Sequence, residues 1–391
     1  MYRKRLVQNI LSVLLMFPII PIATQEVTLR APELDGKSWI LMDAETGFIL
    51  SEQNADEPLP PASLAKMMTT HIAVTQIQQG VLKERDEVLV SDNAWEKGGA
   101  KTDGSTMFLE PRTKVPVIDL MRGIIVQSGN DAAIALAEHI SGSEDAFSNL
   151  MNDYAEQLGM SNTFYYNATG LPAEGMVSSA RDLAKLAKAV IDADPDYYKI
   201  YSEKYFQHNN INQPNRNRLL WRDSSVDGLK TGYTRSAGYC LVASAKRNDM
   251  RLISVLMGSS SAESRARQTQ KLLSFGFRHF DTKKIYSRGD ILKPNARVWF
   301  GSEDFLNLTI EDDIVLTLPR RSEKSVVANI IVDEQLEAPI SEGQELGRLQ
   351  VSLTDTILVN VPLVAEKGIP ESGVFSRLYD WIILFFTKLM S

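Results

Sequence analysis

The sequence predicts an α/β domain built on an antiparallel sheet, followed by a small all-β sandwich and a C-terminal amphipathic helix. Three observations support this order. Strand-like runs enclose a long stretch with helical periodicity, short apolar runs recur at close intervals after residue 282, and the last residues are strongly amphipathic. We therefore expect an N-terminal leader and three folded parts, over residues 1–25, 26–281, 282–368 and 374–391.

The first 25 residues have the composition of a secretory signal peptide. Arg3, Lys4 and Arg5 form a basic start without an acid, and residues 10–22 are almost wholly apolar before Ala23. A buried helix would leave this basic cluster and the prolines inside the apolar run unexplained. The small-residue pattern before Ala23 is a poor cleavage signal, so the cleavage position stays open.

Strand patterns begin and end the α/β part. Residues 38–43 and 47–51 are predicted to form two strands joined by a turn, and residues 239–246 and 251–257 a second pair. Between and after them, helical periodicity predicts helices at 64–78, 117–125, 131–140, 144–158, 180–191 and 264–275. Strands at both ends of a helical region favour one antiparallel sheet in which the first and last strands meet.

The C-terminal part changes character twice. Short apolar runs lie at 298–301, 308–310, 314–318, 326–332, 349–353 and 356–361 and carry no catalytic grouping, which favours a structural or docking module. On a helix, the polar residues of the tail fall within about 120°, and this strip, with Arg377, Asp380 and Lys388, is expected to stay with lipid headgroups. The apolar stretch is too short to span a bilayer, so we expect the helix to lie in the membrane interface. The alternative is packing against the protein's own surface.

Composition excludes several classes of function. A net charge of −7 argues against nucleic acid as a partner. The four histidines are far apart and have no metal-ligand spacing, so neither a metal site nor a cofactor is predicted. Cys240 lies in an apolar run, which is typical of a buried small hydrophobe rather than a nucleophile.

The string Ser63-Leu-Ala-Lys66 supplies a nucleophile and a base. At a helix start, residues three apart lie on one face. A serine hydroxyl needs a neighbouring base, and a lysine serves as one only when burial or nearby positive charge lowers its pKa. Lys230 is a candidate source of that charge. The backbone amide of Ser63, at the helix start, is a candidate oxyanion donor.

Two further strings complete the set. In Ser128-Gly-Asn130 the hydroxyl can relay a proton, and the amide of Asn130 can order Lys66 and bind a substrate amide. In Lys230-Thr231-Gly232 a strand beside a glycine lets a substrate lie along the backbone, and the first two residues can hold a carboxylate. The amide of Tyr233 is the natural second oxyanion donor. In this order the strings predict a serine acyl-transfer site without a catalytic histidine.

The segments that contain these strings, 61–69, 122–131 and 226–234, resemble the D-alanyl-D-alanine carboxypeptidases, which are low-molecular-mass penicillin-binding proteins. The resemblance extends over nearly the whole chain from Val27. It implies a serine β-lactamase/transpeptidase-like fold and removal of the terminal D-alanine from the peptidoglycan pentapeptide stem. It also implies covalent inhibition by β-lactam antibiotics and a peripheral place on the periplasmic side of the bacterial inner membrane. Further similar segments are 178–182, 215–217 and 237–244.

Residue roles follow from the same resemblance. It implies Ser63 as the acylated nucleophile, Lys66 as the base, Ser128 as the proton relay and Lys230 as the carboxylate anchor. By position, two arginines near the substrate carboxylate correspond to Arg265 and Arg216.

Two departures from the family pattern and two alternative functions stay open. Some relatives have histidine where this chain has Tyr233 and Thr169, so the deacylation rate and the side-chain preference do not transfer. A β-lactamase of the same core would need a deacylating glutamate, for which Glu174 is the only candidate. The other rival is a non-catalytic penicillin-binding scaffold of the cell-wall machinery that acts through residues 282–368.

Overall fold

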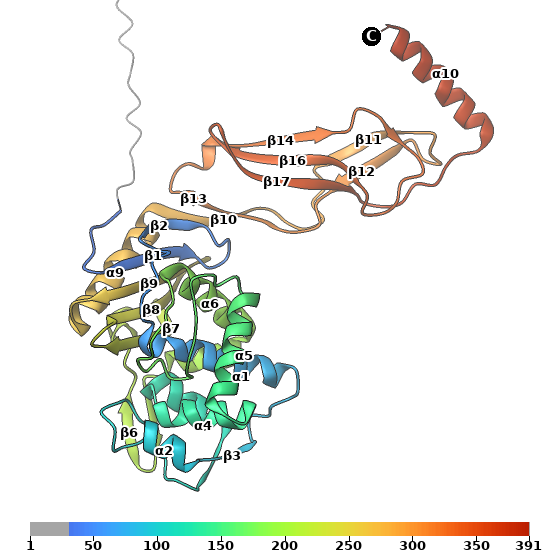
Figure 1. Ribbon diagram of the computed structural model, residues 1–391. Helices are drawn as coiled ribbons and strands as arrows, with labels where there is room; N and C mark the ends of the chain where they lie inside the picture. Colours follow the sequence, from blue (N-terminus) through green and yellow to red (C-terminus); the bar gives the residue numbers. More distant parts are fainter. Residues whose placement is uncertain (1–30, 391) are drawn as a thin grey trace, which may run out of the picture. The chain divides into compact units, whose positions relative to one another are not determined.

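The first and last strands of the α/β part lie side by side in one five-stranded antiparallel sheet (Figure 1). Its order is β2 (Ile49–Gln53), β1 (Ser38–Asp43), β9 (Met250–Ser259), β8 (Gly238–Arg247) and β7 (Val226–Thr234). In this computed structural model, which describes residues 31–390 and side chains to residue 387, β1 pairs with β9 over its whole length. The predicted meeting of terminal strands is confirmed, whereas the predicted signal peptide lies outside the described residues.

The predicted helices are present, and the one expected at 64–78 begins with a 3-10 turn at 62–65. The segment expected to be a single helix at 117–125 divides into α3 (Val117–Arg122) and a π-helical turn, η2 (Gly123–Gln127), which ends at Ser128 in the left-handed region with φ 64°. This strained conformation lies at one of the predicted site residues. The remaining helices are η1 (Ala62–Ala65), α1 (Lys66–Gln78), α2 (Asp92–Gly98), α4 (Asn130–Ser141), α5 (Glu144–Gln157), α6 (Ala180–Ala193), α7 (Pro195–Tyr198), η3 (Lys199–Ser202), α8 (Leu219–Arg222) and α9 (Ala262–His279).

Two small two-stranded sheets escaped the sequence analysis because each strand is too short for an alternating pattern. They pair β3 (Glu87–Leu89) with β4 (Lys114–Pro116), and β5 (Tyr205–His208) with β6 (Ile211–Pro214). Helix α1 is buried over most of its first two turns, which is typical of a helix at the centre of a core. Lys66, the base predicted from the sequence, therefore begins a buried helix.

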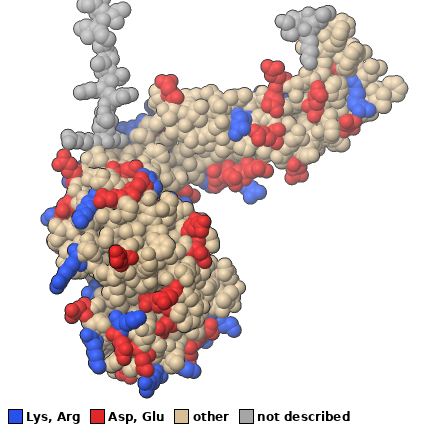
Figure 2. All heavy atoms as spheres, viewed as in Figure 1, with Lys and Arg blue, Asp and Glu red and all other residues tan. Residues whose placement is uncertain are grey.

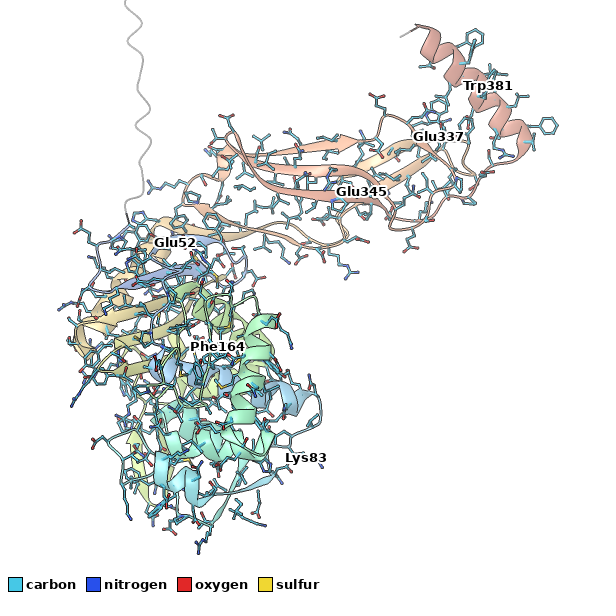
Figure 3. All side chains as sticks on the ribbon, viewed as in Figure 1. Glu52, Lys83, Phe164, Glu337, Glu345 and Trp381 are labelled. Carbon is cyan, nitrogen blue, oxygen red and sulfur yellow. The ribbon has the colours of Figure 1, made fainter. Side chains whose placement is uncertain are left out.

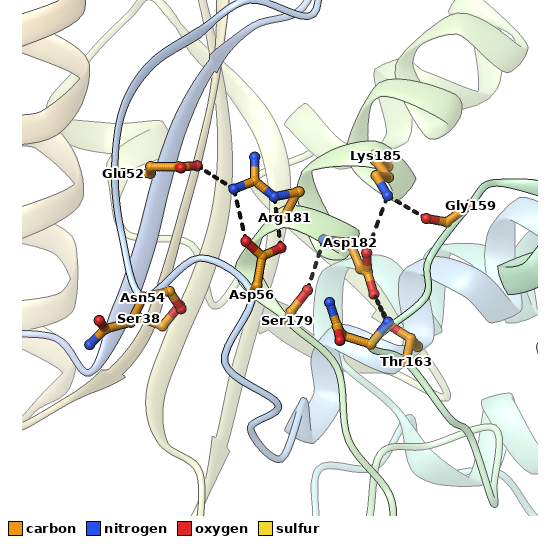
Figure 4. Close-up of polar contacts among 11 residues, drawn as sticks. Ser38, Glu52, Asn54, Asp56, Gly159, Thr163, Ser179, Arg181, Asp182 and Lys185 are labelled. Carbon is orange, nitrogen blue, oxygen red and sulfur yellow. Dashed lines mark hydrogen bonds and ion pairs between the residues drawn. The ribbon is translucent and has the colours of Figure 1, made fainter.

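The segment 178–182, noted for its family resemblance, has a structural role (Figure 4). Arg181 pairs with Asp56 at 2.7 Å and with Glu52 at 2.8 Å. The buried carboxylate of Asp182 accepts a hydrogen bond of 2.9 Å from the hydroxyl of Thr163. These contacts fasten the chain around β2 and the turn before residue 164 to the start of α6.

The C-terminal part is β-rich, as predicted, and contains two sheets. The smaller pairs β10 (Phe280–Tyr286) with β13 (Ile314–Pro319). The six-stranded sheet has the order β14 (Val326–Val332), β16 (Glu345–Leu353), β17 (Thr356–Ala365), β12 (Phe305–Thr309), β11 (Lys293–Trp299) and β15 (Leu336–Glu337). Its core includes the fully buried Leu308, Leu349, Val351 and Leu363.

The tail forms helix α10 (Val374–Met390) and exposes large apolar side chains, among them Phe375 at 90% and Trp381 at 57% (Figure 3). One prediction for its polar strip was wrong. Asp380 is only 4% exposed; its carboxylate accepts from the backbone N–H of Phe300 at 2.8 Å and pairs with Arg297 at 3.3 Å. A buried carboxylate requires such partners, so this face of α10 contacts the β-rich part rather than headgroups. The side chain of Lys388 lies outside the described residues.

Within residues 31–390, α10 included, no helix has the length and apolar character needed to cross a membrane.

Candidate active site

The three predicted strings come together around one cleft of about 470 Å³. Ser63 comes from η1, Ser128 from the end of η2, Asn130 from the start of α4, and the Lys230–Gly232 string from β7. Lys66 and Lys230 do not line the cleft, because both are buried beneath it. The predicted residues that do line it are Ser63, Ser128, Asn130, Arg216, Thr231, Gly232, Tyr233 and Arg265.

A glycine in β7 allows the strand to approach the turn that carries the serine. A Cβ added to Gly232 would lie 3.1 Å from the carbonyl oxygen of Pro61 and 3.2 Å from the Cβ of Ala62. Such contacts are tighter than packed side chains normally allow. The glycine of the K-T-G string therefore permits the close contact of β7 with η1 that brings Ser63 beside the strand.

A second glycine packs against the same turn from another side. Gly170 has a φ of +77°, and a Cβ added there would lie 1.8 Å from the carbonyl oxygen of Ala62. Only glycine tolerates both the conformation and the contact. The loop that includes Thr169 and Gly170 is thus held directly against the serine-bearing turn.

The amine of Lys66 is held by three oxygen atoms. Its Nζ lies 2.7 Å from Oδ1 of Asn130, 2.6 Å from the carbonyl oxygen of Thr169 and 3.2 Å from Oγ of Ser63. The first two oxygens can only accept, so each takes one N–H. In the neutral amine the remaining position is the lone pair, and it points at the serine hydroxyl. In this arrangement the neutral amine can accept the proton of the serine hydroxyl.

Burial lowers the pKa of the Lys66 amine. The side chain of Lys66 has no exposed surface, and burial lowers its pKa to about 7, while the carboxylates of Asp131 and Glu144 act to raise it. A lysine with its usual pKa would be almost wholly charged at neutral pH and unable to accept a proton. Of the two causes expected from the sequence, burial and the charge of Lys230, burial is the one that chiefly lowers the pKa of Lys66.

Lys230 and Ser128 form the second pair of the site. The Nζ of Lys230 donates to Oγ of Ser128 at 2.8 Å and to the carbonyl oxygen of Thr231 at 3.0 Å. Burial, and then the nearby cations, beginning with Lys66, hold the pKa of Lys230 well below its usual value. Because the lysine fills one acceptor position of Ser128, the serine O–H is left to donate into the cleft.

Aromatic and basic residues line the cleft beside β7. Arg265 donates to the carbonyl oxygens of Gly232 at 3.1 Å and Cys240 at 3.2 Å, and its guanidinium lies 5.7 Å from the ring centre of Tyr239. The exposed ring of Tyr233 packs against that of Tyr239, with centres 4.3 Å apart and the planes tilted by 30°. Strands β7 and β8 therefore fix the position of Arg265 beside the cleft through these two carbonyl oxygens.

Sequence reasoning missed two contributors. One is the carbonyl oxygen of Thr169, since a backbone group leaves no mark in residue type. The other is Asp131, whose buried carboxylate accepts from the backbone N–H groups of Met107 at 2.8 Å and Leu109 at 3.0 Å and so fixes the residue next to Asn130. An acid directly after the S-x-N string was the available signal.

Two other sequence candidates lie away from the site chemistry. Glu174 is exposed and does not line the cleft. The thiol of Cys240 is fully buried, and burial raises its pKa to about 11, which agrees with a packing role.

Comparisons with known proteins agree with this geometry. Residues 25–261 match the family model described as D-alanyl-D-alanine carboxypeptidase, and residues 280–371 match the C-terminal domain of penicillin-binding protein 5. The chain is 43% identical to D-alanyl-D-alanine carboxypeptidase DacC of Escherichia coli over 369 residues, covering 92% of this chain and 91% of the relative.

Solved structures give the same result. The structure of penicillin-binding protein 5 from Haemophilus influenzae superposes with a TM-score of 0.81 at 40% identity, over 88% of this chain and 99% of that chain. Penicillin-binding protein D2 from Listeria monocytogenes, in its ampicillin-bound form, has a TM-score of 0.57 at 30% identity over 63% of this chain and 99% of that chain.

Proposed function

Because the chain belongs to the D-alanyl-D-alanine carboxypeptidase family, we propose a role in that reaction for each side chain of the cleft. The enzyme is a serine-type carboxypeptidase that removes the terminal D-alanine of peptidoglycan pentapeptides. The observation that carries the assignment of roles is the placement of a buried lysine, with a pKa of about 7, at 3.2 Å from Oγ of Ser63.

Acylation begins at this pair. Neutral Lys66 takes the proton of Ser63 as Oγ attacks the carbonyl carbon between the two D-alanines. The negative charge that develops on the carbonyl oxygen is stabilised by the backbone N–H groups of Ser63 and Tyr233. The bond to the terminal D-alanine then breaks, and the acyl group stays on Oγ.

The leaving amine must receive a proton. The proton passes from Lys66 through the hydroxyl of Ser128, whose oxygen is already engaged by Lys230. Thr231 and Arg265 line the cleft where the terminal carboxylate of the substrate would lie along β7, and they supply donors and positive charge. Lys230 is buried beneath this part of the cleft and acts as the carboxylate anchor from there. Water then hydrolyses the acyl-enzyme, with Lys66 acting again as the base.

The same chemistry accounts for inhibition by β-lactams. Their strained amide acylates Ser63 in the same way, which agrees with the ampicillin-bound form of the Listeria relative. A β-lactamase function is disfavoured, because Glu174 is exposed and does not line the cleft. A non-catalytic scaffold is disfavoured by the intact contacts of Lys66.

A direct test is the release of D-alanine. The purified chain, incubated with a pentapeptide ending in D-Ala-D-Ala, should liberate one free D-alanine per peptide and leave the tetrapeptide. Cys240→Ser is a suitable control, because it changes a buried group outside the cleft. Penicillin hydrolysis that outpaces D-alanine release would instead favour the β-lactamase.

We further propose that residues 1–25 direct export to the periplasm and that α10 holds the enzyme on the membrane surface. The support for the second point is the exposed apolar surface of α10; in the view of Figure 2, uncharged surface predominates over its described part. Trp381 and its aromatic neighbours have the composition of an interfacial helix.

Truncation before Val374 tests the anchor. The truncated chain should move from the membrane fraction to the soluble fraction and keep its activity on a soluble peptide. Phe385→Asp should act in the same direction, because it places a charge on the apolar face, and Thr387→Ser serves as the matched control. A truncated chain that still sediments with membranes would contradict this role for α10.

A further inference from the structure

Strand β14 ends the six-stranded sheet with an exposed apolar edge. Within the part of the chain that the structure describes, only β16 pairs with it. Val327, Ile330 and Ile331 are 48%, 41% and 50% exposed, and the strand contains neither a charged residue nor a proline. Natural sheets usually protect an edge of this kind with such residues. We propose that β14 pairs antiparallel with β14 of a second copy of this chain, with the two-fold axis at Asn329.

The backbone is arranged for this pairing. The carbonyl of Ser325 accepts from the N–H of Thr354, and the N–H of Asp333 donates to the carbonyl of Leu346, so both residues face β16. Backbone groups alternate in direction along a strand, so the odd-numbered residues of β14 face β16 and the even-numbered ones face the open edge. The groups directed to that edge include the N–H and C=O of Ala328, Ile330 and Val332.

A two-fold axis at Asn329 uses these groups in matched pairs. It places Ala328 opposite Ile330 of the partner subunit, and both are edge-facing residues, as an antiparallel ladder requires. Asn329 then lies opposite its own copy in a non-hydrogen-bonded pair. Because Asn329 is the central residue of β14, every residue of the strand has a partner in the second copy. An axis at another residue would leave one end of the strand unpaired.

Charges at the two ends of β14 favour the antiparallel direction. Glu323 and Lys324 precede the strand, whereas Asp333 and Glu334 follow it, and all four are exposed. Glu323 is already paired with Lys283 at 3.3 Å, which leaves Lys324 as the charge at that end. About the proposed axis Lys324 lies beside Glu334 of the partner subunit, and the symmetric contact repeats at the other end. A parallel pairing in register would instead bring like charges together, which is unfavourable.

The apolar layer of the sheet would also continue across the axis. Ile330 lies opposite the fully buried Leu349 and Ala328 opposite the fully buried Val351, so these β14 residues belong to the inward face. At the unpaired edge of β14 this inward layer ends at Ile330, whose side chain is partly exposed. A second β14 would cover it with the same inward face.

The expected dimer is weak. A contact limited to one short strand pair buries less than the roughly 1,200 Å² of stable interfaces, so we expect dissociation constants of roughly micromolar order or higher. The proposed membrane anchor would raise the local concentration and the dimer fraction, but the pairing itself does not depend on the anchor or on the catalytic function.

A single cysteine tests both the contact and its register. The only native cysteine, Cys240, is buried, so the full chain carrying Asn329→Cys has one accessible thiol. The proposed pair places the two Cα atoms about 4.5 Å apart, within the range that a disulfide bridges. Under mild oxidation it should give a covalent dimer that reductant reverses. Val327→Cys is the matched control, because its copies would lie about 13 Å apart on the same face, so it should link at least tenfold more slowly.

Charge reversal provides the second test. In the Asn329→Cys background, Lys324→Glu should slow cross-linking several-fold, and adding Glu334→Lys should restore it. D-alanine release on a soluble peptide should be unchanged in all variants, which shows that they are folded. The proposal is overturned if Asn329→Cys stays monomeric in folded protein, if Val327→Cys links equally fast, or if the double reversal does not rescue the single one.

Discussion

Replacing Asn130 by aspartate should move the pH dependence of acylation to higher pH. The substitution keeps the shape of the side chain and the oxygen that accepts from Lys66 at 2.7 Å, but it adds a negative charge at that point. A carboxylate so close stabilises the charged form of the lysine and raises its pKa. Because the neutral amine is the base, a higher pKa means that a higher pH is needed to generate it.

The magnitude follows from the pKa of Lys66, which burial lowers to about 7. At pH 7 about half of the native enzyme then has a neutral Lys66. An opposite charge at this distance typically shifts a pKa by about 1–3 units, which leaves a neutral fraction of roughly one tenth to one thousandth. Acylation at pH 7 should therefore slow by roughly fivefold to 500-fold and recover once the pH exceeds the new pKa.

The assay is the rate of covalent labelling by a fluorescent penicillin, measured from pH 5.5 to pH 10. The native enzyme should lose labelling below pH 7, about tenfold per unit, and the variant should show the same slope displaced to higher pH. Glu144→Gln is the opposite control: it removes a carboxylate that raises the pKa of Lys66 and keeps an acceptor for the N–H of Ala168. The acid limb of its pH profile, where the labelling rate falls as the pH decreases, should move to lower pH.

One result would refute the reasoning. If Asn130→Asp lowers the rate equally at every pH and leaves the acid limb near pH 7, Asn130 acts through the substrate and does not govern the charge of Lys66. The position of the limb, rather than the rate at one pH, decides the matter, because the variant also loses an amide donor.

Three further predictions concern the same cleft. Ser63→Ala should abolish covalent penicillin labelling, and labelling that persists at the native rate would assign the nucleophile elsewhere. Lys66→Ala should remove acylation almost entirely, whereas Lys230→Ala should chiefly raise KM for the peptide by roughly tenfold or more; equal losses of kcat in both would contradict their separate roles. Gly232→Ala should lower the free energy of unfolding by about 1–3 kcal/mol and slow acylation, because the added Cβ would lie 3.1 Å from the carbonyl oxygen of Pro61. An unchanged melting temperature and labelling rate would show that β7 can shift to make room.

Much of the fold followed from local patterns. The apolar periodicity predicted the first and last strands of the sheet and most of the helices, because those elements are long enough to show a face. It failed for the two-stranded sheets of three or four residues per strand and for the π turn at 123–127, where no period can be read. It also misplaced Asp380, because an amphipathic pattern marks a polar face without showing what that face contacts.

The chemical identity of the site was readable from the sequence by itself. A nucleophile and its base three residues apart at a helix start, followed by Ser128, Asn130 and Lys230 in order, require particular side chains, and side chains are what a sequence records. Their local spacing was enough to place Ser63 and Lys66 on one face.

Only the tertiary structure decided how that base works. The carbonyl oxygen of Thr169 holds Lys66 from 103 positions away, and carbonyl groups are the same at every residue, so no pattern signals it. The lowered pKa arises from burial of Lys66, which is a property of everything packed around it rather than of its neighbours in the chain. The close contact of Gly232 with Pro61 likewise depends on two segments meeting, and distance in space is the quantity that a linear sequence does not contain.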